Sequence, residues 1–139
     1  MATRFSFTGE KIVNIAHESK KLGADLFVLD DGWFGARNFD DKGLGDWFVN
    51  EKKLKGGLDT IINHCKEKGL KFGLWFEPEM VNENSDLFRA HPEYAAIKPG
   101  ETPTRSRNQL ILDFSKKEVV DCVYSMISAL LEKHDISYI

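Results

Sequence analysis

LFVLDDGWFG, the stretch at residues 26–35, passes directly from four apolar residues to two aspartates, a glycine and a tryptophan. A second stretch, KFGLWFEPE at residues 71–79, changes from apolar to acidic in the same way. Short apolar runs without alternation are typical of parallel strands that are covered on both faces. Parallel α/β folds carry their functional side chains where such strands end. The sequence therefore predicts two parallel strands with a functional edge near Asp30 and Asp31.

A helix–turn–strand unit repeats along the chain. The predicted helices end near Leu22, Gly69 and His134, and the strands that follow them occupy residues 26–29, 72–76 and 136–139. Residues 4–7 read like the tail of an earlier strand. A closed (β/α)₈ TIM barrel needs about 250 residues. The 139 residues are therefore predicted to be an α/β segment of such a barrel, with about three helix–strand units, and not a closed barrel.

The predicted helices carry apolar stripes and end signals. The stripe of the first helix runs from Ile12 to Leu22, and Gly23 stands where a left-handed cap belongs. The third helix is expected to begin with a capping box of Ser115 and Glu118. The stripe of the second helix comprises Leu58, Ile61, Ile62 and Cys65, and that of the third comprises Val119, Val123, Met126, Ile127 and Leu130.

Residues 81–114 form a long insertion between the second strand and the third helix. Long connections in compact domains are usually functional. We expect an added hairpin or short helix here, folded over the strand ends.

The composition of the chain is typical of a globular protein and gives no sign of nucleic-acid binding or of a membrane span. Apolar residues make up 42% and charged residues 29% of the chain, which is ordinary for a globular protein. The net charge of −3 provides no basic field for nucleic acid. No apolar run reaches the ~20 residues of a membrane span, and the N-terminus lacks the apolar core of a signal peptide. Cys65 and Cys122 fall on apolar stripes and are expected to be reduced core residues.

Four motifs carry a resemblance to a known family. They are LFVLDDGWFG at 26–35, GLGDW at 43–47, KFGLWFEPEMV at 71–81 and RNQL at 107–110. They resemble the α-galactosidases of glycoside hydrolase family 36 across nearly the whole chain. The resemblance implies a (β/α)₈ catalytic barrel that removes terminal α-galactose from oligosaccharides such as melibiose and raffinose, with retention of configuration. It also implies two catalytic aspartates and no metal or cofactor.

The resemblance assigns substrate-binding roles to four residues. Asp30 and Asp31 would hold the 4- and 6-hydroxyls of galactose. Trp75 would pack against the sugar, and Arg107 would reach the substrate. The family's nucleophile lies in a Tyr-Ile-Lys-Trp-Asp motif, of which this chain has Tyr138-Ile139. No catalytic residue is therefore expected in the chain, because the nucleophile and the general acid belong beyond Ile139.

Several features have simpler interpretations. The aspartate pair could cap the turn before Gly32. Glu77 and Glu79 are expected to be structural and not an acid–base pair, and Trp33 and Trp47 fit either loop packing or sugar contact.

The function also has alternatives. The chain could be a non-catalytic piece with no activity of its own. The intact enzyme could instead be an α-N-acetylgalactosaminidase or a galactosyl transferase. For the intact enzyme we expect an α-galactoside substrate, no nucleic acid or membrane partner, a homo-oligomer and a cytoplasmic location.

Overall fold

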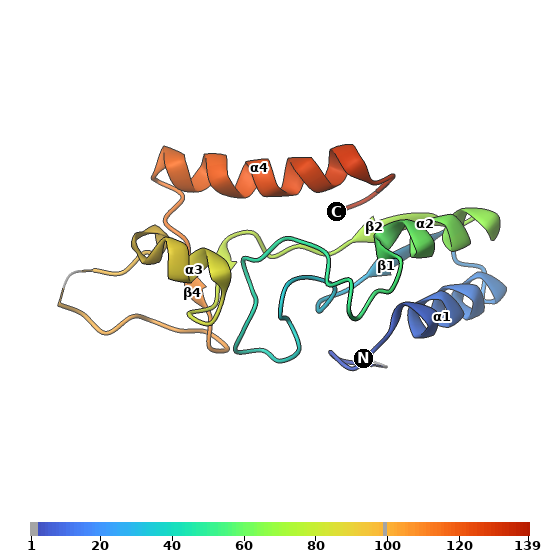
Figure 1. The fold of residues 1–139 in the computed structure, drawn as a ribbon, viewed down its shortest axis with the longest axis horizontal. Coiled ribbons are helices and arrows are strands. Elements are labelled where there is room, and N and C mark those ends of the chain that lie inside the picture. Colours follow the sequence, from blue (N-terminus) through green and yellow to red (C-terminus); the bar gives the residue numbers. More distant parts are fainter. Residues whose placement is uncertain (1–2, 99) are drawn as a thin grey trace. The chain divides into compact units, whose positions relative to one another are not determined.

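The computed structural model describes residues 3–98 and 100–139, so residue 99 of the expected insertion lies outside the described residues. The chain folds into two compact units. The strand unit comprises the residues up to Trp33, Val49–Phe76 and Leu130–Ile139, and the insertion unit comprises Phe34–Phe48 and Glu77–Ala129. In chain order the elements are α1 (Gly9–Lys21), β1 (Leu26–Leu29), α2 (Gly57–Glu67), β2 (Lys71–Leu74), β3 (Met80–Val81), α3 (Asp86–Ala90), η1 (Pro92–Tyr94), β4 (Leu110–Ile111) and α4 (Lys117–Lys133) (Figure 1).

The sheet of the strand unit is parallel, as predicted. β1 and β2 pair one for one over residues 26–29 and 71–74. On the other edge of β2, Gly73 forms a parallel bridge with Tyr138, and the N–H of Leu74 donates to the carbonyl of Tyr138 at 2.9 Å. The three segments predicted as neighbouring parallel strands therefore pair in that way, although the third contributes a single bridge.

β2 ends at Leu74, two residues before the predicted end at Phe76. The N–H of Trp75 still donates to the carbonyl of Leu29 at 3.0 Å. The carbonyl of Trp75, however, accepts the indole N–H of Trp33 at 2.9 Å. The next ladder bond is missing because the N–H of Asp31, which would donate to this carbonyl, donates instead to Oδ1 of Asp30 at 2.7 Å.

β1 is covered on one face. Leu29 is buried, whereas Leu26 and Val28 are each 37% exposed. Successive side chains of a strand point to opposite faces. The prediction that this strand is covered on both faces is therefore wrong for the described residues, which form an open α/β segment and no closed barrel.

α1 begins directly after its N-cap residue, Thr8. The side-chain oxygen of Thr8 accepts a backbone N–H of the first turn at 3.3 Å, and Ile12 and Ala16 are buried. Leu22, predicted on the same stripe, is instead 89% exposed. It is the C-cap, and Gly23 after it takes the predicted left-handed conformation with φ +91°.

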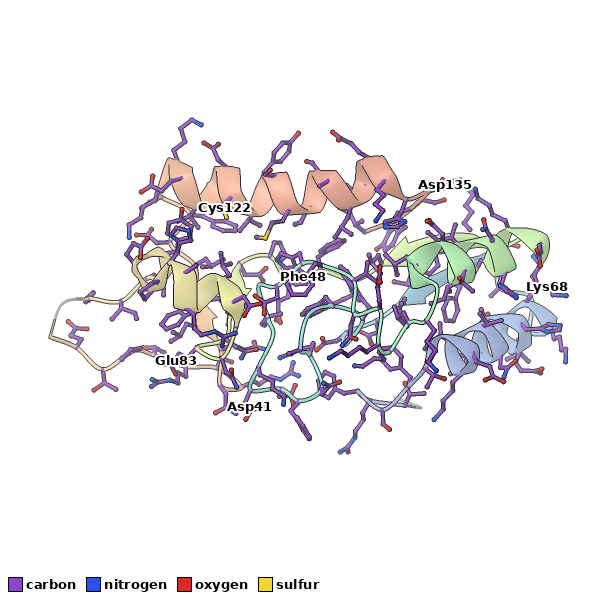
Figure 2. The ribbon with its side chains drawn as sticks, in the orientation of Figure 1. Asp41, Phe48, Lys68, Glu83, Cys122 and Asp135 are labelled. Atoms are coloured by element: carbon purple, nitrogen blue, oxygen red, sulfur yellow. The ribbon has the colours of Figure 1, made fainter. Side chains whose placement is uncertain are left out.

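α2 buries its predicted stripe. The residues are Leu58, Ile61, Ile62 and Cys65. Burial raises the pKa of the Cys65 thiol to about 11, so this sulfur stays protonated at neutral pH. Lys68 is the C-cap (Figure 2), and Gly69 follows with φ +67°.

The insertion unit contains a short helix, α3, and a pair of antiparallel strands. Met80 of β3 pairs with Ile111 of β4, and Val81 pairs with Leu110. Ser85 caps α3 by accepting the N–H of Phe88 at 3.0 Å. Whether the insertion lies over the strand ends stays a prediction.

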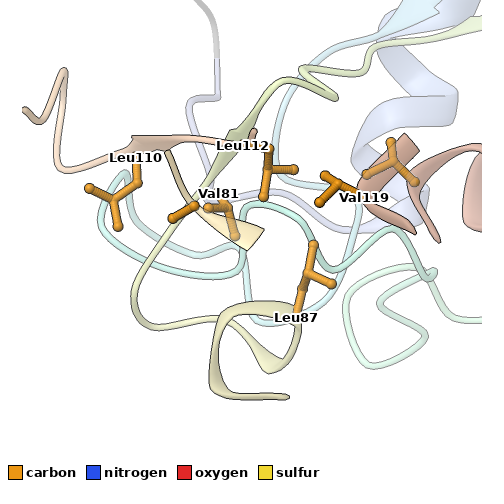
Figure 3. Packing of buried hydrophobic residues seen from close by; sticks show 7 residues of the cluster. Val81, Leu87, Leu110, Leu112 and Val119 are labelled. Atoms are coloured by element: carbon orange, nitrogen blue, oxygen red, sulfur yellow. The ribbon is translucent and has the colours of Figure 1, made fainter. Parts of the chain in front are cut away.

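The core of the insertion unit is a cluster of small aliphatic side chains (Figure 3). They come from β3, α3, β4 and the first turns of α4, with Ala95 just after η1 and Leu112 just after β4, so residues about 40 positions apart share one core. Its buried members are Val81, Leu87, Ala95, Leu110, Leu112, Val119 and Val123. This cluster holds Ala95 and Leu110, the two residues that flank positions 96–109.

α4 ends near the predicted position, at Lys133, and starts differently from the prediction. It begins at Lys117, and the hydroxyl of Ser115 donates to Oδ1 of Asp113 at 2.6 Å. The predicted capping box of Ser115 and Glu118 is wrong, because Oδ1 of Asp113 accepts the Ser115 backbone N–H at 3.2 Å, the group that Glu118 would bind in a capping box. The predicted stripe is present, with Val119 fully buried.

Residues 4–7 are not a strand. The N–H of Ser6 donates to the carbonyl of Thr3 at 3.0 Å, and Arg4 has φ +47°, so the chain turns there. Among residues 3–98 and 100–139, no helix combines the length and apolar character needed to cross a bilayer.

Candidate functional site

The paired aspartates lie directly after β1, at the carboxyl end of the sheet. β1 ends at Leu29, and the N–H of Asp31 donates to Oδ1 of Asp30 at 2.7 Å. Gly32 follows with φ +101°, a conformation that a residue with a Cβ rarely adopts. The chain therefore bends directly after the strand. Without this bend the two adjacent carboxylates would point to opposite faces and could not contact the same ligand. Asp30 also takes part in the turn, so the turn interpretation and the site interpretation coexist.

Trp75 occupies the equivalent place after β2. Leu29 pairs with Leu74 at the carboxyl ends of the two strands. The residues that follow them, Asp30 and Trp75, are therefore neighbours at this end of the sheet. Leu74 is fully buried and Trp75 is half-buried. The structure therefore brings Asp30, Asp31 and Trp75 together at one edge.

Trp33 packs against the residues that follow β2, at the carboxyl end of the sheet. Its indole N–H donates to the carbonyl of Trp75 at 2.9 Å. Its ring meets Phe76 edge-on, with centroids 5.4 Å apart and planes at 78°. Trp33 is wholly buried, so within this chain it packs the loop and does not face a ligand.

Lys53 and Asn50 hold the turn from the other side. Nζ of Lys53 donates to the carbonyl of Gly32 at 2.7 Å and lies 4.8 Å from the centroid of the Phe7 ring. The N–H of Asn50 donates to the carbonyl of Trp33 at 2.9 Å. Sequence reasoning missed both residues, because nothing distinguishes Lys53 from its neighbouring lysines until the chain is folded.

Arg107 belongs to the insertion unit. It is exposed, and its Nη2 donates to Oδ1 of Asp40 at 2.7 Å. Arg107 and Asn108 have φ +52° and +62°, two successive left-handed residues that are not glycine. Sequence reasoning missed Asp40, which stands 67 residues away in the chain.

Asp46 and Trp47 are structural residues of the insertion unit. The Asp46 carboxylate accepts the N–H of Asp86 at 3.1 Å and that of Leu87 at 3.0 Å, which secures the start of α3. Burial is the main cause that raises the pKa of Asp46 above its ordinary value, against the lowering effect of these two bonds. Trp47 is 2% exposed and packs on Phe34 at a centroid distance of 4.5 Å, so its role in this chain is packing.

The glutamates of the second motif have backbone roles. The carbonyl of Glu77 accepts the N–H of Met80 at 3.2 Å, and that of Glu79 accepts the N–H of Leu112 at 2.8 Å. In residues 3–98 and 100–139 no group of three His, Cys, Asp or Glu side chains could hold a metal ion.

The sheet edge is suited to bind a polar ligand with apolar faces. Two carboxylates accept hydrogen bonds from hydroxyl groups, and charge-assisted bonds of this kind are strong. An indole beside them can cover the C–H face of a sugar ring. The arrangement can therefore orient a carbohydrate.

The known proteins that this chain resembles act on carbohydrates, in agreement with a site that can orient a carbohydrate. The Melibiase family model matches residues 1–139. The bifunctional alpha-galactosidase/sucrose kinase AgaSK of Mediterraneibacter gnavus is 55% identical over 138 residues, which are 99% of this chain and 15% of that protein. Alpha-galactosidase AgaA of Geobacillus stearothermophilus is 49% identical over 99% of this chain and 19% of its own length.

Solved structures give the same result. The crystal structure of the GH36 α-galactosidase AgaA variant A355E D548N in complex with raffinose superposes with a TM-score of 0.93, at 49% identity, over 98% of this chain and 19% of that one. This chain thus spans less than a fifth of the length of these relatives. The match over the whole chain and the identity to several α-galactosidases of glycoside hydrolase family 36 lead to one conclusion: the chain belongs to the Melibiase family.

Proposed function

We propose that this chain forms part of the galactose-binding wall of an α-galactosidase that removes terminal α-galactosyl residues, with retention of configuration, from oligosaccharides of the melibiose and raffinose type. The observation that carries the proposal is the placing of Asp30, Asp31 and Trp75 at one carboxyl edge of a parallel sheet. Membership of the Melibiase family supports it.

The site residues have separate roles in this proposal. Asp30 and Asp31 accept hydrogen bonds from the 4- and 6-hydroxyls of galactose and so select the axial O4. Trp75 covers the apolar face of the ring. Arg107 donates to hydroxyls, for which a planar guanidinium fork is suited.

Bond cleavage requires residues other than these. A retaining glycosidase uses two carboxyl groups about 5–5.5 Å apart, one as nucleophile and one as general acid and base. We place both outside this chain, in the remaining strands of a (β/α)₈ barrel to which the helix–strand units of this chain belong. The aspartate pair orients the sugar and strengthens its hydrogen bonds as the ring flattens toward the oxocarbenium ion. The chain by itself is then inactive.

The proposals of a cytoplasmic location and a homo-oligomer rest on the family resemblance alone. Sizing the purified enzyme by light scattering tests the second.

The test is a chimera in which this chain replaces the aligned segment of AgaA, 49% identical to it. We call it the AgaA chimera. It should release nitrophenol from an aryl α-galactoside, and turn over the aryl α-N-acetylgalactosaminide far more slowly. A folded chimera with no turnover of either substrate would refute the proposed function. A preference for the N-acetylated substrate would replace it with the α-N-acetylgalactosaminidase alternative.

A further inference from the structure

Arg107 stands on a backbone turn that must be held in place. It and Asn108 have φ +52° and +62°. Residues with a Cβ adopt this left-handed conformation at a cost, and two in succession persist only when the surroundings hold them. Arg107 itself is exposed, with 60% of its side chain accessible. The flanking residues close the turn, since the N–H of Ser106 donates to the carbonyl of Gln109 at 3.1 Å and the N–H of Gln109 donates to the carbonyl of Ser106 at 2.9 Å.

The Asn82 side chain ties this closed turn to the rest of the insertion unit. Asn82 is completely buried, and its Nδ2 donates to the carbonyl of Asn108 at 2.9 Å and to that of Asp40 at 3.2 Å. Its Oδ1 accepts the N–H of Leu44 at 2.9 Å and Nη1 of Arg37 at 3.0 Å. Every hydrogen-bonding position of this amide is in use.

Arg37 fixes the loop that faces the turn. It is completely buried, and its Nη1 donates to the carbonyls of Phe39, Asp40 and Lys42 at 3.3, 2.9 and 3.3 Å. A loop folded around a buried guanidinium has little freedom. It presents the Asp40 carboxylate to Nη2 of Arg107 at 2.7 Å.

The two anchors act on different parts of Arg107. Asn82 holds the backbone beside it, and Asp40 holds its guanidinium. Both belong to the insertion unit. An isolated exposed ion pair contributes little to stability, so the pair with Asp40 is better explained as orientation.

We propose that Asn82, with Asp40 as its partner, is a positioning residue for Arg107 and thereby sets how well the site binds its galactoside. This rests on the proposed function, in which Arg107 contacts the substrate. Neither Asn82 nor Asp40 touches the substrate in this proposal.

The first test is Asn82→Asp in the AgaA chimera. The carboxylate keeps the size of the amide and can still accept from Arg37 and Leu44. It cannot donate to the carbonyl of Asn108 and repels it. We expect a rise in KM for an aryl α-galactoside and a loss of roughly tenfold to a hundredfold in kcat/KM, because small misplacements of a binding group are costly.

Asn84→Asp is the matched control. It makes the same chemical change two residues along the loop, at an exposed side chain whose Oδ1 accepts only from Arg89. We expect kcat/KM within about twofold of the unsubstituted chimera, as for most exposed substitutions.

The decisive measurement is a double-mutant cycle with Arg107→Ala. If Asn82 acts through Arg107, Asn82→Asp should cost about twofold or less once Arg107 is absent. A purely structural role would cost the same in both backgrounds and would overturn the proposal, as would an unchanged kcat/KM in folded Asn82→Asp.

Asp40→Asn decides the matter if Asn82→Asp does not fold, because the Asp40 side chain is 48% exposed. It should raise KM, and this effect should also vanish in the Arg107→Ala background. No effect of Asp40→Asn, or an effect that persists without Arg107, would overturn the proposal. An inactive unsubstituted chimera would instead refute the proposed function, so the two failures are distinguishable.

Discussion

At the scale of single residues, Asp31 is the sharpest test of the sugar-binding assignment. Asp31→Ala in the AgaA chimera removes a charged acceptor from a sugar hydroxyl. We expect a loss of about 1.5–3 kcal/mol in transition-state binding, or roughly tenfold to more than a hundredfold in kcat/KM. Asp30→Ala should behave similarly. Steady-state kinetics on an aryl α-galactoside measure both, and turnover at the unsubstituted rate by Asp31→Ala would show that the paired aspartates are wrongly assigned.

Asp46 should give α3 a pH-dependent stability. Burial raises its pKa above the ordinary value of 3.8, so the folded protein holds this proton more tightly than the unfolded chain. Its contribution to stability is then full below pH 3.8 and is lost as the pH rises through the raised pKa. Asp46→Asn stays neutral throughout and provides the reference.

Hydrogen exchange of the peptide that contains α3 measures this effect in the AgaA chimera. Protection in the unsubstituted protein, relative to Asp46→Asn at the same pH, should fall with rising pH across that window and then become constant. Relative protection that rises with pH would mean that the two N–H bonds to Asp46 outweigh its burial.

The sequence predicted the site residues that neighbouring positions in the chain identify. It missed those whose role depends on a partner far away in the chain. Asp30 and Asp31 stand out because they follow an apolar run within a few positions. Lys53, Asp40 and Asn82 do not, because each acts on a residue at least 21 positions away. These residues meet their partners only after the loops have folded, so the sequence alone does not indicate their roles.

At the scale of elements, helix stripes were predictable and element ends less so. The stripe of α2 is buried as its periodicity requires. β2 ends early because the Asp31 N–H binds Oδ1 of Asp30 and not the carbonyl of Trp75, which instead accepts the Trp33 indole, 42 residues away. The capping box of α4 failed because Asp113, a residue outside the motif, competes for Ser115. The end of a helix or strand depends on a few competing hydrogen bonds. The burial of an apolar helix stripe depends on the sum of many packing contacts.

Gly73 should be essential for the spacing of the strands. A Cβ there would lie 3.0 Å from Cγ2 of Val28 and 3.2 Å from Cβ of Tyr138. Gly73→Ala should therefore destabilise the AgaA chimera by about 1–3 kcal/mol, the usual cost of overpacking. Its thermal midpoint should fall accordingly.

Gly9→Ala is the control for that experiment. Its Cβ would meet no atom closer than 3.7 Å, and it lies in α1, where alanine is favoured over glycine. We expect an unchanged or higher midpoint. A midpoint for Gly73→Ala equal to that of Gly9→Ala would show that the strands can separate without cost.

At the scale of the whole molecule, the 139 residues alone should be inactive and prone to associate. Both catalytic carboxyls are proposed to lie elsewhere, and losing a nucleophile removes most of the rate enhancement. The outer edge of β1 is unpaired among the described residues, and Leu26 and Val28 are 37% exposed. Unpaired edges and exposed apolar faces promote association.

Nitrophenol release and light scattering on the purified chain measure the two expectations. Turnover comparable to the AgaA chimera would mean that Asp30, Asp31 or Glu77 performs the chemistry. A monodisperse monomer would show that the open edge and the exposed face of β1 are tolerated in water.

The left-handed turn at Arg107 and Asn108 also limits how selection can reshape this pocket. In a randomised library at position 108, glycine, asparagine and aspartate codons should survive a screen for activity, since these residues tolerate positive φ. Valine, isoleucine and threonine codons should be depleted whatever their side chains could offer a new substrate. New substrate preferences should therefore arise at positions outside this turn, because its backbone conformation accepts few residue types.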